Sequence, residues 1–149
     1  MTRLAQTIGR KKAFVIAFLL AMAATIGYFR MFNGKGDIWM SGVMGFCQLA
    51  LFAGFAIYLP ELFPTRLRST GTSFCYNVGR FLAASGPFTL GKLQAALKAG
   101  ASTPEAKIEA FRNAATYMSA IFLLGLVALL FLPETKGQPL PEDTAPAKA

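Results

Sequence analysis

The charged residues of this chain are confined to short segments, and this distribution constrains the fold more than any other feature. Four apolar stretches separate the charged segments, at about residues 13–32, 38–59, 69–91 and 113–132. The second and fourth carry no charge, and the third carries only Arg80. A helix of about 20 apolar residues crosses the hydrocarbon core of a bilayer, where backbone polar groups must be hydrogen-bonded within the protein. The sequence therefore predicts an all-α membrane protein with four transmembrane helices.

The composition argues against several functional classes. The 149 residues are 54% hydrophobic and 15% charged, whereas about 25% of the residues of soluble domains are charged. There is no histidine, which excludes histidine metal sites and proton relays. Cys47 and Cys75 both fall within predicted spans, where they are expected to be buried free thiols. No nucleophile–base constellation is visible, so we expect no enzyme, metal or cofactor.

The basic residues lie beside the apolar stretches and give a net charge of +8. In that position they favour an anionic membrane surface, and not nucleic acid, as their partner. The dense clusters "GRKK" (9–12) and "RLR" (66–68) fall on the side of both termini. The positive-inside rule therefore predicts cytoplasmic termini in a multi-pass protein of the plasma (inner) membrane. The first apolar run is longer than a secretory signal core, so no cleaved signal is expected.

The remaining segments carry turn and helix-start signals. In "STPEAKIEAFR" (102–112), Ser102 or Thr103 can cap a helix whose first position is Pro104. We expect a short surface helix there, within an outer segment of about residues 92–112, that leads into the fourth span. "SGP" (85–87) predicts a bend, because proline removes a backbone hydrogen bond. The Pro- and Ala-rich tail, 138–149, is predicted to be a disordered cytoplasmic tail.

The third apolar stretch has distinct faces when it is stepped at about 100° per residue. Its polar face comprises Ser73, Tyr76, Asn77, Arg80 and Ala84. A second face carries the small residues Gly71, Cys75, Gly79 and Gly86. Small residues spaced in this way let another helix approach closely. The polar face is expected to line protein or a water-filled cavity.

Arg80 is the most informative residue of that stretch. It lies about 16 Å from either end of the predicted span, which is far for its charge to reach the interface. An arginine at mid-membrane costs about 2.5–3.5 kcal/mol to insert and marks a functional site by default. Two roles remain open for its guanidinium: an ion pair with an acid elsewhere, or recognition of an anionic substrate. Tyr76 and Asn77, on the same face, are further candidates for substrate contact.

The second stretch contains one strongly polar side chain, Gln48, near its middle. Gln48 is a candidate for substrate contact, and its alternative role is a hydrogen bond between helices. Trp39 and Tyr58 lie near the two ends of this stretch and are interpreted as interfacial belt residues. Phe52 and Phe55 either line a pocket or pack in an apolar core.

Three segments together resemble one family. "LAQTIGRKKAF" (4–14) resembles the cytoplasmic Gly-Arg-Lys loop of major facilitator superfamily transporters. "PELFPTRLRSTG" (60–71) resembles the charged loop after the tenth helix of the sugar-porter and organic-ion branches, and "PETKG" (133–137) resembles the signature after their twelfth helix. The resemblance implies that residues 1–137 form a partial C-terminal bundle, corresponding to helices 9–12 of a twelve-helix transporter.

The resemblance implies a function and a set of partners. The chain would be part of a secondary active transporter that moves a small anionic or sugar-like metabolite by alternating access. Its partners would be the substrate, the bilayer and the missing transporter helices, from the same longer chain or another subunit. The chain alone is not expected to transport. The alternative is a self-contained four-span structural or regulatory subunit that oligomerises.

The same resemblance points to a cytoplasmic gate or anchor. Its candidate residues are Arg10, Glu61, Arg66, Arg68 and Glu134. Arg66 and Arg68 are expected to reach lipid phosphates or to pair with Glu61 or Glu134, and they act either as a topological anchor or as a gate latch. The family's loop carries an acid three positions before its glycine, where this chain has Gln6.

Overall fold

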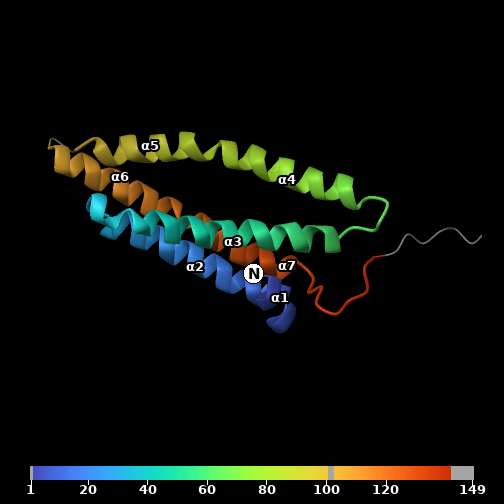
Figure 1. Ribbon diagram of the computed structural model, residues 1–149. Coiled ribbons are helices and arrows are strands. Elements are labelled where there is room, and N and C mark those ends of the chain that lie inside the picture. Colours follow the sequence, from blue (N-terminus) through green and yellow to red (C-terminus); the bar gives the residue numbers. More distant parts are fainter. Residues whose placement is uncertain (1, 101–102, 142–149) are drawn as a thin grey trace, which may run out of the picture.

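The computed structural model describes residues 2–100 and 103–141, and the regular structure of this part is entirely helical (Figure 1). The helices are α1 (Thr2–Ile8), α2 (Arg10–Met31), η1 (Lys35–Asp37, 3₁₀), α3 (Trp39–Glu61), α4 (Arg68–Ala84), α5 (Gly86–Lys98), α6 (Pro104–Met118) and α7 (Ile121–Phe131). The predicted all-α fold is confirmed. Of the predicted disordered tail, residues 138–141 have no regular secondary structure, and 142–149 lie outside the described residues.

Three helical segments are long and apolar enough to cross a membrane, by length and composition. They are Arg10–Met31, Lys35–Glu61 and Pro104–Phe131, and they contain most of the first, second and fourth predicted spans. Helix α3, in the second of these segments, continues through Pro60 and ends at Glu61. The third predicted span, 69–91, is divided between α4 and α5, which have 17 and 13 residues.

Ser85 separates α4 from α5. Its hydroxyl donates a hydrogen bond to the carbonyl of Leu82 at 2.7 Å, and Pro87 stands at the start of α5 without an N–H to donate. The predicted bend at 85–87 is therefore confirmed. Helix α5 then continues to Lys98, seven residues beyond the end predicted for the third apolar stretch at residue 91. The sequence "KLQAALK" (92–98) consists of good helix formers, which extend the helix.

The start of α6 agrees with the predicted cap. The Thr103 hydroxyl accepts a hydrogen bond from the backbone N–H of Ala106 at 3.3 Å, and Pro104 occupies the first turn. Ser102, the other candidate, lies outside the described residues. The helix expected in this segment is present as α6, but it is longer than expected, because it runs to Met118. After a break at residues 119–120, it continues as α7 within a single candidate span.

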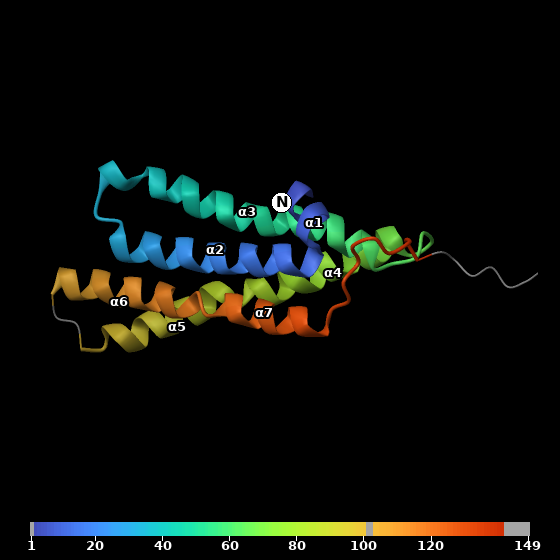
Figure 2. The same ribbon diagram turned by 90° about the horizontal axis from the view of Figure 1, so that it is seen from below.

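Successive long helical segments run antiparallel. Helices α4 and α5 together form one bent rod, and so do α6 and α7 (Figures 1 and 2). Helix α2 packs against α3 on one side and against α6 and α7 on the other. The α4–α5 rod returns along α3, and α5 then packs against α6. Helix α2 is therefore the centre of the bundle, whereas α4 lies at its edge.

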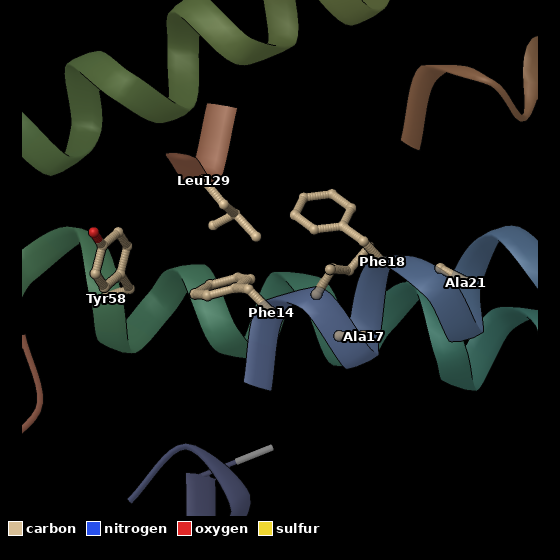
Figure 3. Packing of buried hydrophobic residues seen from close by; sticks show 7 residues of the cluster. Phe14, Ala17, Phe18, Ala21, Tyr58 and Leu129 are labelled. Carbon is tan, nitrogen blue, oxygen red and sulfur yellow. The ribbon is translucent and has the colours of Figure 1, made fainter. Parts of the chain in front are cut away.

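The core lies where α2, α3 and α7 meet (Figure 3). The Phe14 ring contacts the rings of Phe55 and Tyr58, with centroids 4.9 and 5.6 Å away. Leu129 of α7 closes the cluster. Tyr58 is only 2% exposed, so its interpretation as an interfacial belt residue was wrong. Its hydroxyl finds a protein partner, the carbonyl of Pro133, and can therefore be buried.

The small-residue face of α4 does not make the close helix contact expected from its sequence. A Cβ added at Gly79 or Gly86 would meet no atom within 4 Å in the described chain. A Cβ added at Gly71 would lie 2.6 Å from the Phe63 ring, but Phe63 belongs to the preceding loop and not to another helix. No side chain of α4 or α5 is buried in the described part of the molecule.

Candidate functional site

The three sequence motifs converge at one end of the bundle, which we call the motif end and define by Arg10, Glu61, Glu134 and Thr135. Helix α2 begins there and α3 ends there, and the segment after α7 passes between them. The Arg10 guanidinium donates two hydrogen bonds to the Glu61 carboxylate, from Nη2 to Oε1 at 2.7 Å and from Nε to Oε2 at 3.1 Å. Two-point contacts of this kind are among the stronger charged hydrogen bonds in proteins.

Glu134 caps the beginning of α2. Its carboxylate accepts backbone N–H bonds from Arg10 at 2.8 Å and Lys11 at 3.1 Å, and a third from Lys136 at 3.1 Å. Those amides of the first turn have no partner within their own helix. Burial raises the pKa of the Glu134 carboxyl, but these bonds and the Arg10 charge lower it by more, so its pKa is below the ordinary value.

Gly9 makes this cap possible. It has φ 100° and ψ 158°, a backbone conformation open essentially to glycine alone. A Cβ at this position would lie 2.9 Å from Glu134 Oε2. The glycine of the first motif therefore both turns the chain from α1 into α2 and leaves room for a carboxylate from the last motif.

Two residues at or beside the motif end, Thr135 and Tyr58, were not singled out from the sequence as site residues. The Thr135 hydroxyl donates a hydrogen bond to Glu61 Oε2, and the Tyr58 hydroxyl donates one to Pro133. Both bonds fix the segment after α7 to the end of α3. Helical spacing offers a signal for Tyr58, because it lies three residues before Glu61 and on the same face of α3.

The expected pairing of Arg66 or Arg68 with Glu61 was wrong, because Arg10 and Thr135 occupy that carboxylate. Arg68 Nε instead donates to the Pro60 carbonyl at 3.0 Å, and Arg66 is exposed in the turn before α4. Gln6 is exposed, and Glu61 supplies the acidic partner of the loop's arginine.

A second candidate site is a cavity of about 320 Å³ between α3 and α4. Arg80 and Tyr76 both line it, opposite the aromatic side chains of Phe52 and Phe55. The full lining is Phe52, Phe55, Leu59, Cys75, Tyr76, Gly79, Arg80 and Ala83. The Arg80 guanidinium makes no hydrogen bond or ion pair with the described chain. It is therefore the single formal charge in a largely apolar cavity.

Gln48 and Asn77 do not line this cavity. Gln48 Nε2 donates to Thr25 Oγ1 of α2 at 3.2 Å, and that hydroxyl donates to the Ala21 carbonyl at 2.7 Å. Gln48 thus makes the interhelical hydrogen bond that was its alternative role. Asn77 donates to Ser73 one turn earlier in its own helix at 2.9 Å. Substrate contact by these two residues stays a prediction.

The model of the sugar (and other) transporter family matches residues 2–145. The chain belongs to this family. The predicted membership of the major facilitator superfamily is thereby confirmed, which places the chain in a family of transport proteins. Cys47 and Cys75 are free thiols, as expected, but both are half-buried and not buried as predicted. No solved structure matches this member of the family at a significant level.

Several curated relatives carry the names of transport proteins. The inner membrane metabolite transport protein YhjE of Escherichia coli is 34% identical over 92% of this chain and 30% of its own length. A probable 4-methylmuconolactone transporter of Cupriavidus pinatubonensis is 26% identical over 90% of this chain and 29% of its own length. A cis,cis-muconate transport protein of Acinetobacter baylyi is 28% identical over 91% and 30%. The chain thus spans about 30% of the length of the curated relatives it matches.

Proposed function

We propose that this chain forms part of a secondary active transporter that carries a small organic anion across the membrane by alternating access. Family membership supports transport, and three helical segments are suited to span a bilayer. An anionic substrate agrees with a relative whose name states that it transports cis,cis-muconate. The observation that carries the proposal is the unpartnered guanidinium of Arg80 in the α3–α4 cavity.

The chemistry of the cavity favours a carboxylate with an apolar body. A guanidinium presents five N–H donors in a planar fork that matches the two oxygens of a carboxylate. A charge placed among apolar walls is costly until an opposite charge joins it. The Tyr76 hydroxyl can add a hydrogen bond, and Phe52 and Phe55 offer apolar surface to the rest of the molecule. Together, the guanidinium, the hydroxyl and the aromatic rings favour binding of an organic anion over a neutral sugar.

The motif end serves in this proposal as the cytoplasmic gate of the chain. The Arg10–Glu61 pair and the Glu134 cap hold α2, α3 and the segment after α7 together. Arg66 lies in the turn after α3 and Arg68 begins α4, a position where positive charge anchors a loop on the cytoplasmic side. Both termini are then cytoplasmic.

The remaining helices are proposed to come from the same longer chain or from another subunit. Helices α4 and α5 bury no side chain, and the Phe81 side chain of α4 is 83% exposed. Such surface can face lipid, but the polar residues of α4 require protein or water beside them. Partner helices would supply the other wall of the α3–α4 cavity.

The test of the substrate site is uptake of a radiolabelled aromatic or unsaturated carboxylate by cells that express the complete transporter. Arg80→Ala is expected to abolish uptake while surface abundance is unchanged, and Arg80→Lys to retain a fraction of it. Lys98→Ala, at the end of α5, removes a cation outside the cavity and serves as the control. Normal uptake by Arg80→Ala would exclude a binding role. Loss of the protein from the membrane would instead favour a structural ion pair.

The test of completeness is the size of the native product, detected with an antibody against the C-terminal residues. A transporter chain is expected to be roughly three times the length of these 149 residues, because they span about 30% of their relatives. A native product of only 149 residues without a transporter partner would favour the self-contained membrane subunit.

A further inference from the structure

A shallow pocket of about 580 Å³ lies against the beginning of α2, apart from the α3–α4 cavity. It is lined by residues of α1, the first two turns of α2 and the segment after α7. These residues are Thr7, Ile8, Lys11, Lys12, Val15, Ile16 and Lys136. Three of the seven are lysines, brought together from positions 11, 12 and 136 of the sequence.

The pocket has a cationic part and an apolar part. Lys11, Lys12 and Lys136 supply three ammonium groups where α2, a candidate membrane span, begins. One turn further along α2, Val15 and Ile16 are 38% and 40% exposed, on the face turned away from the core. In a bilayer, the first turn of a span lies at the level of the lipid headgroups, and the next turns face the acyl chains.

The acids near this pocket do not neutralise its lysines. Glu61 is engaged by the Arg10 guanidinium and the Thr135 hydroxyl, and Glu134 by three backbone N–H groups. The Lys136 ammonium donates to a backbone carbonyl, that of Thr7, at 2.6 Å, which leaves its charge uncompensated. The four cations of this region, Arg10 and the three lysines, therefore outnumber its two carboxylates.

We propose that this pocket binds the phosphate headgroup of an anionic phospholipid, with an acyl chain of the same lipid along Val15 and Ile16. The phosphate oxygens would accept hydrogen bonds from the ammonium groups, and the apolar part would exclude water from the adjoining chain. A free phosphate uses only the cationic part, whereas a zwitterionic lipid brings a positive group against the lysines. The site is thus selective for a negatively charged lipid, whatever substrate the transporter carries.

The test measures retention of phosphatidylglycerol and of phosphatidylcholine by the 149-residue chain, using native mass spectrometry of the protein released from detergent micelles. We expect one phosphatidylglycerol to be bound preferentially. Each lysine near an anionic lipid contributes about a fivefold gain in affinity, so Lys11→Gln/Lys12→Gln/Lys136→Gln should weaken binding about 100-fold. The matched control, Lys92→Gln/Lys98→Gln/Lys107→Gln, removes the same charge from α5 and α6 and should bind as the unmodified chain does.

Three results would overturn the proposal: equal retention of both lipids, equal weakening in the control triple, or displacement of the lipid by glycerol phosphate at the same concentration. The last would identify a free-phosphate site. Circular dichroism checks that each variant keeps its helices. If the triple variant does not fold, Lys12→Gln replaces it, since this exposed side chain makes no hydrogen bond within the described chain. An affinity change of less than twofold in Lys12→Gln would also overturn the proposal.

Discussion

The Glu134 carboxylate accepts a hydrogen bond from the backbone N–H of Arg10, 124 residues earlier in the chain. This bond joins the segment that follows the last helix to the first turn of the central helix. The Arg10 side chain in turn holds Glu61 at the end of α3. A single residue of the first motif, Arg10, thus ties together segments from the other two motifs.

Replacement of Glu134 by glutamine should destabilise the protein near neutral pH, by about 1 kcal/mol, as expected for a lost charged helix cap. The folded-state pKa of this carboxyl lies below its ordinary value of 4.5. Its contribution is therefore present above pH 4.5 and is lost as the pH falls through the lower folded value. Thermal unfolding followed by circular dichroism from pH 7 to pH 3 should show a shallower acid decline in Glu134→Gln. An acid decline identical to that of the unmodified chain would contradict this role.

Gly9→Ala should destabilise the same junction through the backbone. The change places a Cβ at a positive φ and 2.9 Å from Glu134 Oε2. We expect a loss of about 1–3 kcal/mol in the free energy of unfolding. The loss should shrink when Glu134→Ala is already present, because the steric part is then removed. Equal losses in both backgrounds would show that only backbone strain matters. Gly34→Ala is the control, because its Cβ would meet no atom within 4 Å and its backbone is extended, with φ 167°.

The Arg10–Glu61 pair should show coupling in a double-mutant cycle of Arg10→Gln and Glu61→Gln. The two charged hydrogen bonds are partly buried, with side-chain exposures of 15% and 16%. We expect a coupling free energy of about 1–3 kcal/mol, measured by unfolding in sodium dodecyl sulfate. Arg10→Lys should not restore it, because an ammonium cannot make the two-point contact. Additive effects of the two changes on the free energy of unfolding would show that the Arg10 and Glu61 side chains are not energetically coupled.

Gly125→Ala should disturb the contact between α7 and α2. A Cβ there would lie 2.4 Å from the Phe18 ring, inside the core cluster. Overpacking of this kind costs about 1–3 kcal/mol. Gly79→Ala, in α4, is the matched control, since its Cβ would meet nothing within 4 Å. Equal effects of the two changes on thermal unfolding would contradict the packing described for α7. A strong effect of Gly79→Ala only in the complete transporter would identify a missing helix packed there.

Thr25→Val should test the hydrogen bond between α2 and α3. This change removes the acceptor of the Gln48 amide while it keeps the side-chain shape. Hydrogen bonds between membrane helices contribute about 0.6 kcal/mol on average, so a small loss of stability is expected. Thr25→Ser, which keeps the hydroxyl, should lose less of this bond. If Gln48 instead serves only the substrate, Thr25→Val should leave the free energy of unfolding unchanged.

Local sequence patterns predicted the elements that depend on local physics. Apolar length located α2, α3 and the continuous segment of α6 and α7, because a bilayer requires about 20 apolar residues in a helix. The bend at Ser85 and the cap at Thr103 follow from side chains that act on their own backbone neighbours. The three motifs also sufficed to suggest the family before any contact was known.

Contacts between segments that are distant in the sequence could not be predicted from local patterns. Periodicity cannot say which acid meets which arginine, so Glu61 was expected to pair with the nearby Arg66 or Arg68, whereas its partner is Arg10. Nor could it reveal that Tyr58, near the end of a span, is buried because Pro133 offers it a carbonyl. The sequence by itself determined the helices and the family, since both follow from local composition and motif. Only the tertiary structure decided which residues meet at the motif end and in the lysine pocket, because these residues lie more than 50 positions apart in the sequence.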